Sequence, residues 1–64
     1  MSTYHWIMTL QWPQGMVTGD GLIDVSPRTT RSEVFQKIYD DLIRGRAPRG
    51  AHVTFFALEP NSLT

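Results

Sequence analysis

Residues 30–45 read Thr30-Arg-Ser-Glu-Val-Phe-Gln-Lys-Ile-Tyr-Asp-Asp-Leu-Ile-Arg-Gly45, and this stretch decides the fold. Its apolar residues recur every three to four positions, which is typical of an amphipathic helix. They are Val34, Phe35, Ile38, Tyr39, Leu42 and Ile43. Thr30 and Glu33 have the spacing of a capping box, and Gly45 suits a left-handed closing residue. Because so short a helix is marginal alone, we expect its apolar stripe to pack on a small sheet.

The chain has 64 residues, which fits a single domain (residues 1–64) with one hydrophobic core. It contains no cysteine, so it can form neither a disulfide nor a thiolate metal site. Its two histidines are too few for a zinc site of the usual kind. We therefore predict no metal and no other cofactor. A fold this small is expected to gain stability from close packing or from self-association.

Charge and hydropathy argue against several broad classes of protein. The six basic and six acidic side chains balance, so no overall field attracts the chain to nucleic acid or to a membrane. The apolar runs are too short to span a bilayer, and the first residues lack the basic and apolar regions of a secretory signal. The sequence thus predicts a cytoplasmic protein without membrane contact.

Residues 3–12 alternate like a strand with one buried face. The even-numbered positions are expected to face the helix, since all are apolar or aromatic: Tyr4, Trp6, Met8, Leu10 and Trp12. Of the three aromatic residues, Trp12 is the one expected to be partly exposed and to serve an interface, because it adjoins a turn. On the odd-numbered face only Ile7 is apolar. Pro13 and Gly15 favour a hairpin turn, because proline fixes one φ angle and glycine permits a positive one.

The second strand is expected at residues 16–25, with an interruption at Gly19-Asp20-Gly21. Two glycines within three residues favour a β-bulge or a local break in the ladder. An aspartate between glycines could instead belong to a loop that binds phosphate or a cation. Because one carboxylate falls short of a calcium loop and no P-loop lysine follows, we favour the structural interpretation.

Residues 51–58 form the third expected strand, which is apolar on both faces. Strict alternation divides its side chains into two sets: Val53, Phe55 and Ala57 on one face, and Phe56 and Leu58 on the other. A strand that is apolar on both faces is usually central in a sheet or packs against a second surface. Pro60 ends the strand, because proline cannot continue the ladder.

The predicted fold is therefore α+β, with the order β-β-α-β and one helix packed on one face of the sheet. The first two strands are expected to form an antiparallel hairpin. A right-handed crossover would then bring the third strand beside the first and parallel to it, giving a small three-stranded mixed sheet. In this topology the whole chain resembles a reduced β-grasp, or ubiquitin-like, unit.

Arg44, Arg46 and Arg49 form the sharpest local cluster of charge. Their guanidinium groups could bind a phosphate or a carboxylate of a partner. The alternative, which we favour, is that they offset the helix dipole and line a solvated loop.

His5 and His52 would lie near the starts of neighbouring parallel strands and could therefore approach each other, although neither belongs to a metal or catalytic motif.

No arrangement of residues indicates catalysis, so we expect no enzyme. Association with another protein is the function that the sequence favours, because the sheet face opposite the helix would keep apolar residues exposed. We therefore predict a small protein-interaction module, with a homodimer formed through the sheet as one form of it. The alternative is an accessory protein that binds phosphate or nucleic acid through the arginine loop, although net charge disfavours nucleic acid. The candidate interaction residues are Ile7, Trp12, Phe56, Leu58, Arg44, Arg46 and Arg49.

Overall fold

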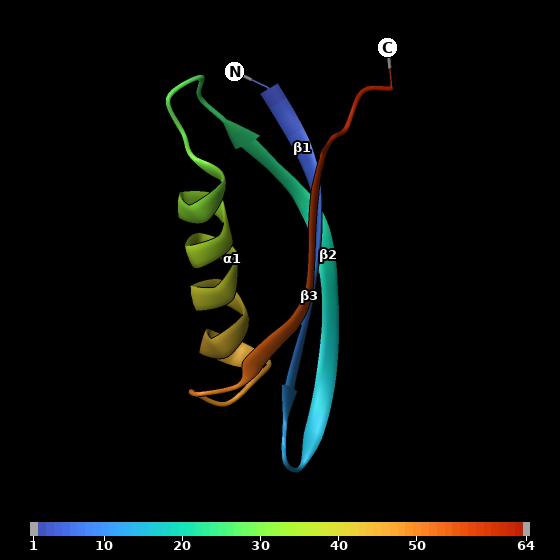
Figure 1. Cartoon of the computed structure of the whole chain (residues 1–64), viewed down its shortest axis with the longest axis vertical. Helices are drawn as coiled ribbons and strands as arrows, with labels where there is room; N and C mark the ends of the chain where they lie inside the picture. Colours follow the sequence, from blue (N-terminus) through green and yellow to red (C-terminus); the bar gives the residue numbers. More distant parts are fainter. Residues whose placement is uncertain (1, 64) are drawn as a thin grey trace.

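The computed structural model describes residues 2–63, which form a three-stranded sheet with one helix packed against it (Figure 1). The elements are β1 (Ser2–Trp12), β2 (Gly15–Val25), α1 (Arg31–Gly45) and β3 (His52–Pro60). The predicted α+β class and the predicted order of elements are confirmed.

The sheet has the strand order β2-β1-β3, and both neighbouring pairs are antiparallel. The prediction of a mixed sheet, and the likeness to a β-grasp unit that followed from it, is therefore wrong. A helical crossover makes the two strands that it joins parallel, and here it joins β2 to β3 (Figure 1). Since β1 lies between these strands and runs against β2, it also runs against β3.

The ladder between β1 and β2 is unbroken from Ser2 opposite Val25 to Trp12 opposite Gly15. The bulge or break predicted at Gly19-Asp20-Gly21 does not occur. These glycines instead leave space on the helix side of β2. A Cβ atom at Gly19 would lie 3.2 Å from the side chain of Leu42 on α1, which is closer than most Cβ contacts.

The bulge lies between β1 and β3. Thr9 is opposite Phe55 and Leu10 is opposite Val53, so Thr54 is the extra residue. An extra residue reverses the alternation of faces along a strand. Val53 therefore faces the helix together with Phe56, and the predicted grouping of Val53 with Phe55 is wrong.

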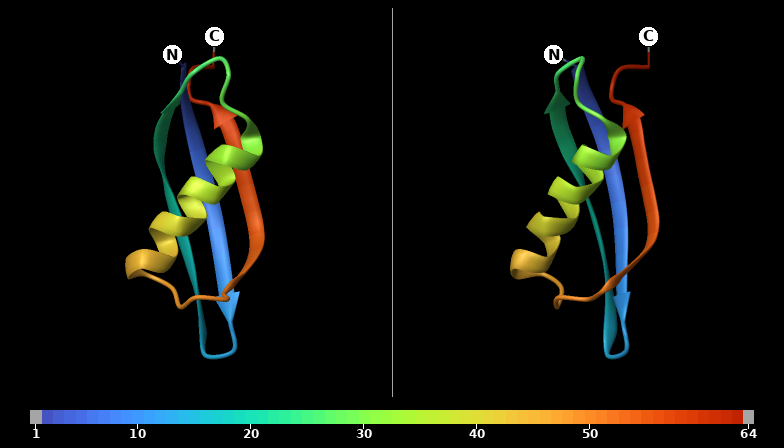
Figure 2. Two further views of the ribbon diagram at one scale, coloured as in Figure 1. Left: turned by 90° about the vertical axis from the view of Figure 1, so that its left-hand side faces the viewer. Right: turned by 60° about the vertical axis from the view of Figure 1, so that its left-hand side comes forward.

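The core lies between α1 and the even-numbered face of β1, as the alternation predicts. Met8 and Leu10 are fully buried. The other buried apolar residues are Val34, Ile38, Leu42 and Ala51. Figure 2 shows α1 crossing the sheet diagonally, from β3 at its first turn toward β2 at its last. At the β3 side, the rings of Phe35 and Phe56 meet edge to face, with centroids 5.2 Å apart.

The two ends of α1 are closed differently. At the N-terminus the capping box is present as predicted: the Glu33 N–H donates to the Thr30 hydroxyl, and the Thr30 N–H donates to the Glu33 carboxylate. At the C-terminus, Gly45 is still helical and Arg46 is the capping residue, with φ of −127°. Among the described residues only Gly50 has a positive φ, of 85°. The predicted left-handed role of Gly45 is therefore wrong.

Candidate functional site: the open face of the sheet

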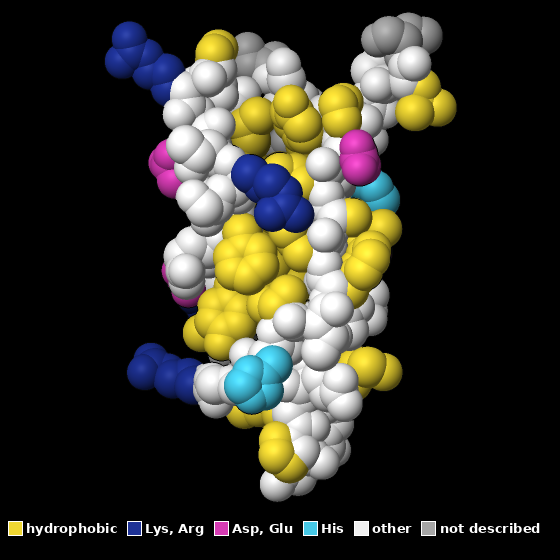
Figure 3. All heavy atoms as spheres, viewed as in Figure 1, with side chains coloured by type: hydrophobic (Ala, Val, Ile, Leu, Met, Phe, Trp, Pro, Cys, Tyr) yellow, Lys and Arg dark blue, Asp and Glu magenta, His cyan; other side chains and the backbone are white. Residues whose placement is uncertain are grey.

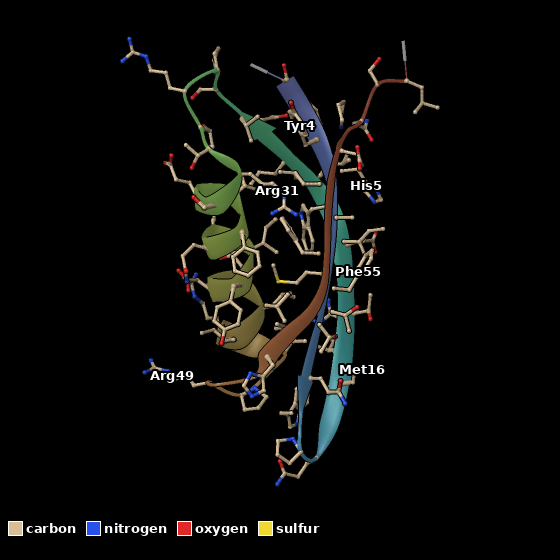
Figure 4. The ribbon with its side chains drawn as sticks, in the orientation of Figure 1. Tyr4, His5, Met16, Arg31, Arg49 and Phe55 are labelled. Atoms are coloured by element: carbon tan, nitrogen blue, oxygen red, sulfur yellow. The ribbon has the colours of Figure 1, made fainter. Side chains whose placement is uncertain are left out.

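The side of the sheet opposite α1 is called here the open face. By the strand register it comprises the odd-numbered positions of β1 and the even-numbered positions of β2, joined by His52, Phe55, Ala57 and Glu59 of β3. Figure 4 shows His5, Met16 and Phe55 directed away from the helix on this side. No segment of the described chain covers the open face (Figure 1).

Apolar side chains are concentrated on the open face. Met16, Leu22 and Phe55 are 64%, 61% and 53% exposed, and the remaining large exposed apolar residue of the described chain is Leu63, near its end. Ile7 and Ala57 are half-buried and lie opposite each other at the centre of the sheet. Phe55 and Leu22 each adjoin this pair, whereas Met16 lies apart from it at the hairpin end. Contiguous exposed apolar area on a small protein often marks a contact surface.

Polar contacts between neighbouring strands cross the same face. The Thr3 hydroxyl donates to the Asp24 carboxylate, and the hydroxyls of Thr9 and Thr18 are 2.9 Å apart. The imidazole of His5 lies 3.4 Å from the carboxylate of Asp20, both partners being on the surface. These contacts link β1 to β2 and leave much of each carboxylate available to water.

The predicted approach of His5 and His52 is not found. Because β3 runs against β1, His5 pairs with Glu59 and His52 pairs with Gln11, near opposite ends of the central strand. Within residues 2–63, no three side chains of His, Asp or Glu are placed to hold a metal ion together.

The balanced net charge conceals a division between the two layers. The three strands contain Asp20, Asp24 and Glu59 but no Lys or Arg, a formal charge of −3. All six basic residues and the other three carboxylates lie in α1 and its connecting loops, a formal charge of +3. In Figure 3 the cationic side chains in view extend from the helix layer, where carboxylates are also visible, whereas a carboxylate and a histidine lie near the opposite side.

The structure places the apolar residues predicted to make contacts on different faces of the sheet. Ile7 lies on the open face, as expected from its odd-numbered position. Phe56 and Leu58, in contrast, face the helix and pack against the core, so their predicted place on a free face is wrong. Phe55 occupies the exposed position instead. Trp12 is half-buried on the helix side, where its ring covers Gly15.

Met16 and Leu22 are exposed apolar residues of the open face that were not among the predicted interaction residues. Both occupy even-numbered positions of β2, in alternation with residues that face the helix. This alternation is visible in the sequence, but the expected break at the glycines prevented its extension along the whole strand.

The three candidate arginines have separate surroundings. The guanidinium of Arg44 lies 3.9 Å from the carboxylate of Asp41, with both side chains largely exposed. Arg46 extends over β2, where its Nη1 atom would be 3.1 Å from a Cβ atom at Gly19. Arg49 points away from the sheet (Figure 4). The arginines thus share no common centre at which an anion would be held by all three.

A hollow of about 370 Å³ lies where the start of α1 meets the ends of β1 and β2. Its walls include Tyr4, Val25, Thr30 and Arg31. The guanidinium of Arg31 is 4.6 Å from the ring centroid of Phe56, so this cation already packs on an aromatic face. No buried polar side-chain atom of the described residues lacks a hydrogen-bond partner.

No protein-family model, curated protein or solved structure matches this chain. Within the described residues, no helix has the length and apolar character needed to cross a membrane. The open face, with its exposed apolar residues and its carboxylates, is the surface that best fits a functional contact.

Proposed function

We propose that this protein is a binding module whose open face packs against a segment of another protein. The observation that supports this proposal is the exposure of Met16, Leu22 and Phe55, each more than half accessible, on one side of the sheet. Apolar area of this kind becomes stabilising when a partner removes it from water, at about 25 cal/mol per Å².

The dimensions of the sheet indicate how large the covering segment needs to be. Three strands spaced by about 4.8 Å form a surface about 14 Å wide. On the other side of this sheet, the 15-residue helix α1 is sufficient to cover the core. Since a helix is about 10–12 Å in diameter, one helix or one hairpin from a partner would cover most of the open face.

Two other predictions are not tested by these observations. Self-association through the sheet remains a prediction, and so does binding of an anion by Arg44, Arg46 and Arg49. No contact in the structure favours the anion function over a solvated loop. The open face is preferred because its exposed apolar groups supply a driving force for association.

Site-specific photo-crosslinking in the cells that produce this protein tests the proposed function. A photoreactive phenylalanine analogue is placed at Phe55, at Leu22 or, as a control, at Lys37, which is exposed on α1. We expect the same protein adduct from positions 55 and 22 and none from position 37. Equal labelling from all three positions, or no adduct from the open face, would refute the proposal. An adduct with a second copy of this chain would show that the open face binds another copy of the protein, in a homodimer, and not a different protein.

A further inference from the structure

We infer that the open face selects a partner segment that carries Lys or Arg next to its apolar side chains. This inference rests on the binding function proposed above and specifies the chemistry of the partner. It follows from the position of the acidic residues beside the exposed apolar ones. The net charge of the whole chain, which is zero, does not show this local arrangement.

The carboxylates lie directly beside the exposed apolar groups. Asp20, Leu22 and Asp24 follow one another along the open face of the edge strand β2, and all three are exposed. Neighbours on one face of a strand are about 7 Å apart, since each residue advances the strand by about 3.4 Å. A partner whose apolar side chain covers Leu22 would therefore bring adjacent groups within reach of two carboxylates. Glu59, on β3, supplies a third at the opposite edge.

The chain itself provides no permanent cation for these groups among the strands. Asp24 accepts a hydrogen bond from the hydroxyl of Thr3, and Asp20 contacts the imidazole of His5 at 3.4 Å. Glu59 is paired with His5 across the ladder. The six Lys and Arg residues all lie outside the strands. A cationic partner can therefore supply the positive charge that this face lacks, and charge complementarity of this kind favours the matching partner and its rapid association.

The same charges disfavour two other occupants. In a two-fold dimer formed face to face, the same patch meets itself, so three carboxylates would approach three carboxylates. Like charges brought together in an interface oppose binding. Nucleic acid is disfavoured for the same reason, because its phosphates would meet an acidic surface.

Selection from a displayed library of random peptides tests the inference. The folded protein is immobilised, and bound peptides are sequenced and compared with the unselected library. Two variants carry the same change of net charge on different layers. The neutral-face variant is D20N/D24N/E59Q. The variant called neutral-helix, in which only the three carboxylates of α1 are neutralised and all cations are kept, is E33Q/D40N/D41N; its glutamine can still serve the capping box. Circular dichroism confirms that each variant is folded before it is used.

We expect the selected peptides to be enriched in Lys and Arg beside apolar residues. Their binding should weaken at least tenfold with the neutral-face variant, weaken with added salt, and change less than threefold with the neutral-helix variant. Peptides that require Phe55 but show no enrichment in Lys or Arg, or that bind the neutral-face variant equally well, would overturn the inference while leaving the proposed function intact. If every selected peptide binds a Phe55→Ser variant as well as the wild type, both are contradicted.

Discussion

The indole ring of Trp6 on β1 lies over Gly21, its neighbour on β2, so closely that a Cβ atom at Gly21 would be 3.2 Å from the ring. A side chain at this position would therefore displace the indole or the strand. This relationship explains a glycine inside a regular strand, where glycine is otherwise unfavourable because of its backbone entropy.

Gly21→Ala is expected to destabilise the protein by about 1–3 kcal/mol, since the added methyl group overpacks the contact with Trp6. Strand propensity alone would predict the opposite sign. Urea denaturation measures the free energy of unfolding. The same substitution made together with Trp6→Leu should cost at least about 0.5 kcal/mol less, because the two positions are in contact. Equal costs in the two backgrounds would show that the ring is not responsible.

Gly45→Ala is expected to stabilise the protein by about 0.4–1 kcal/mol. Gly45 is the last residue of α1, lacks a positive φ and has open space around a Cβ position apart from its own stretch of helix, so alanine reduces the entropy of the unfolded chain without strain. Gly50→Ala, in contrast, should cost about 1–2 kcal/mol because Gly50 adopts a left-handed conformation with φ of 85°. Thermal unfolding of both variants distinguishes the two glycines, and a loss of stability with Gly45→Ala would contradict the observed helix end.

Thr30→Ala is expected to cost about 1 kcal/mol, because the Glu33 N–H loses the hydroxyl that accepts its hydrogen bond. Thr30→Ser keeps the acceptor and serves as the control. Chemical denaturation followed by circular dichroism measures both. If serine is as unfavourable as alanine, the methyl group of Thr30, not its hydroxyl, would be the source of stability.

The helix and the hairpin could be predicted because their signals are local. The capping box at Thr30 and the apolar spacing of Val34, Ile38 and Leu42 depend only on neighbours within a few turns. The sequence also placed β3 correctly beside β1, but the direction predicted for it was wrong. Following the direction of the chain through the crossover would have given the antiparallel pairing with β1.

The open face was only partly predictable for a similar reason. Strict alternation along β3 fails at the bulge at Thr54, and the sequence His-Val-Thr-Phe-Phe carries no clear signal for an extra residue. The identity of the exposed phenylalanine therefore required the structure. The division of charge between the layers, in contrast, follows from the predicted elements, since no Lys or Arg lies in the predicted strands; only Glu59 falls outside the strand ranges that the sequence predicts.

The adjacent residues Phe55 and Phe56 are expected to respond oppositely to the same substitution. Phe56→Thr should cost about 2–4 kcal/mol because its ring packs on Phe35 in the core. Phe55→Thr should change stability by less than about 0.5 kcal/mol, since the side chain is 53% exposed and threonine suits a strand. Urea denaturation of the two variants provides the comparison. Comparable losses would show that Phe55 is part of the fold's own packing and would remove it from the contact surface.

Removal of the carboxylates from the open face is expected to promote self-association. In the neutral-face variant the apolar groups remain exposed, while the repulsion between two acidic faces is lost. We expect its dimer to be at least tenfold tighter than any dimer of the wild type, a difference of about 1.4 kcal/mol. Sedimentation velocity over a dilution series measures this at neutral pH. The neutral-helix variant has the same net charge as the neutral-face variant but keeps the carboxylates of the open face. It should therefore associate no more than the wild type if the charges act through the open face. Equal association of the two variants would instead attribute the effect to net charge alone.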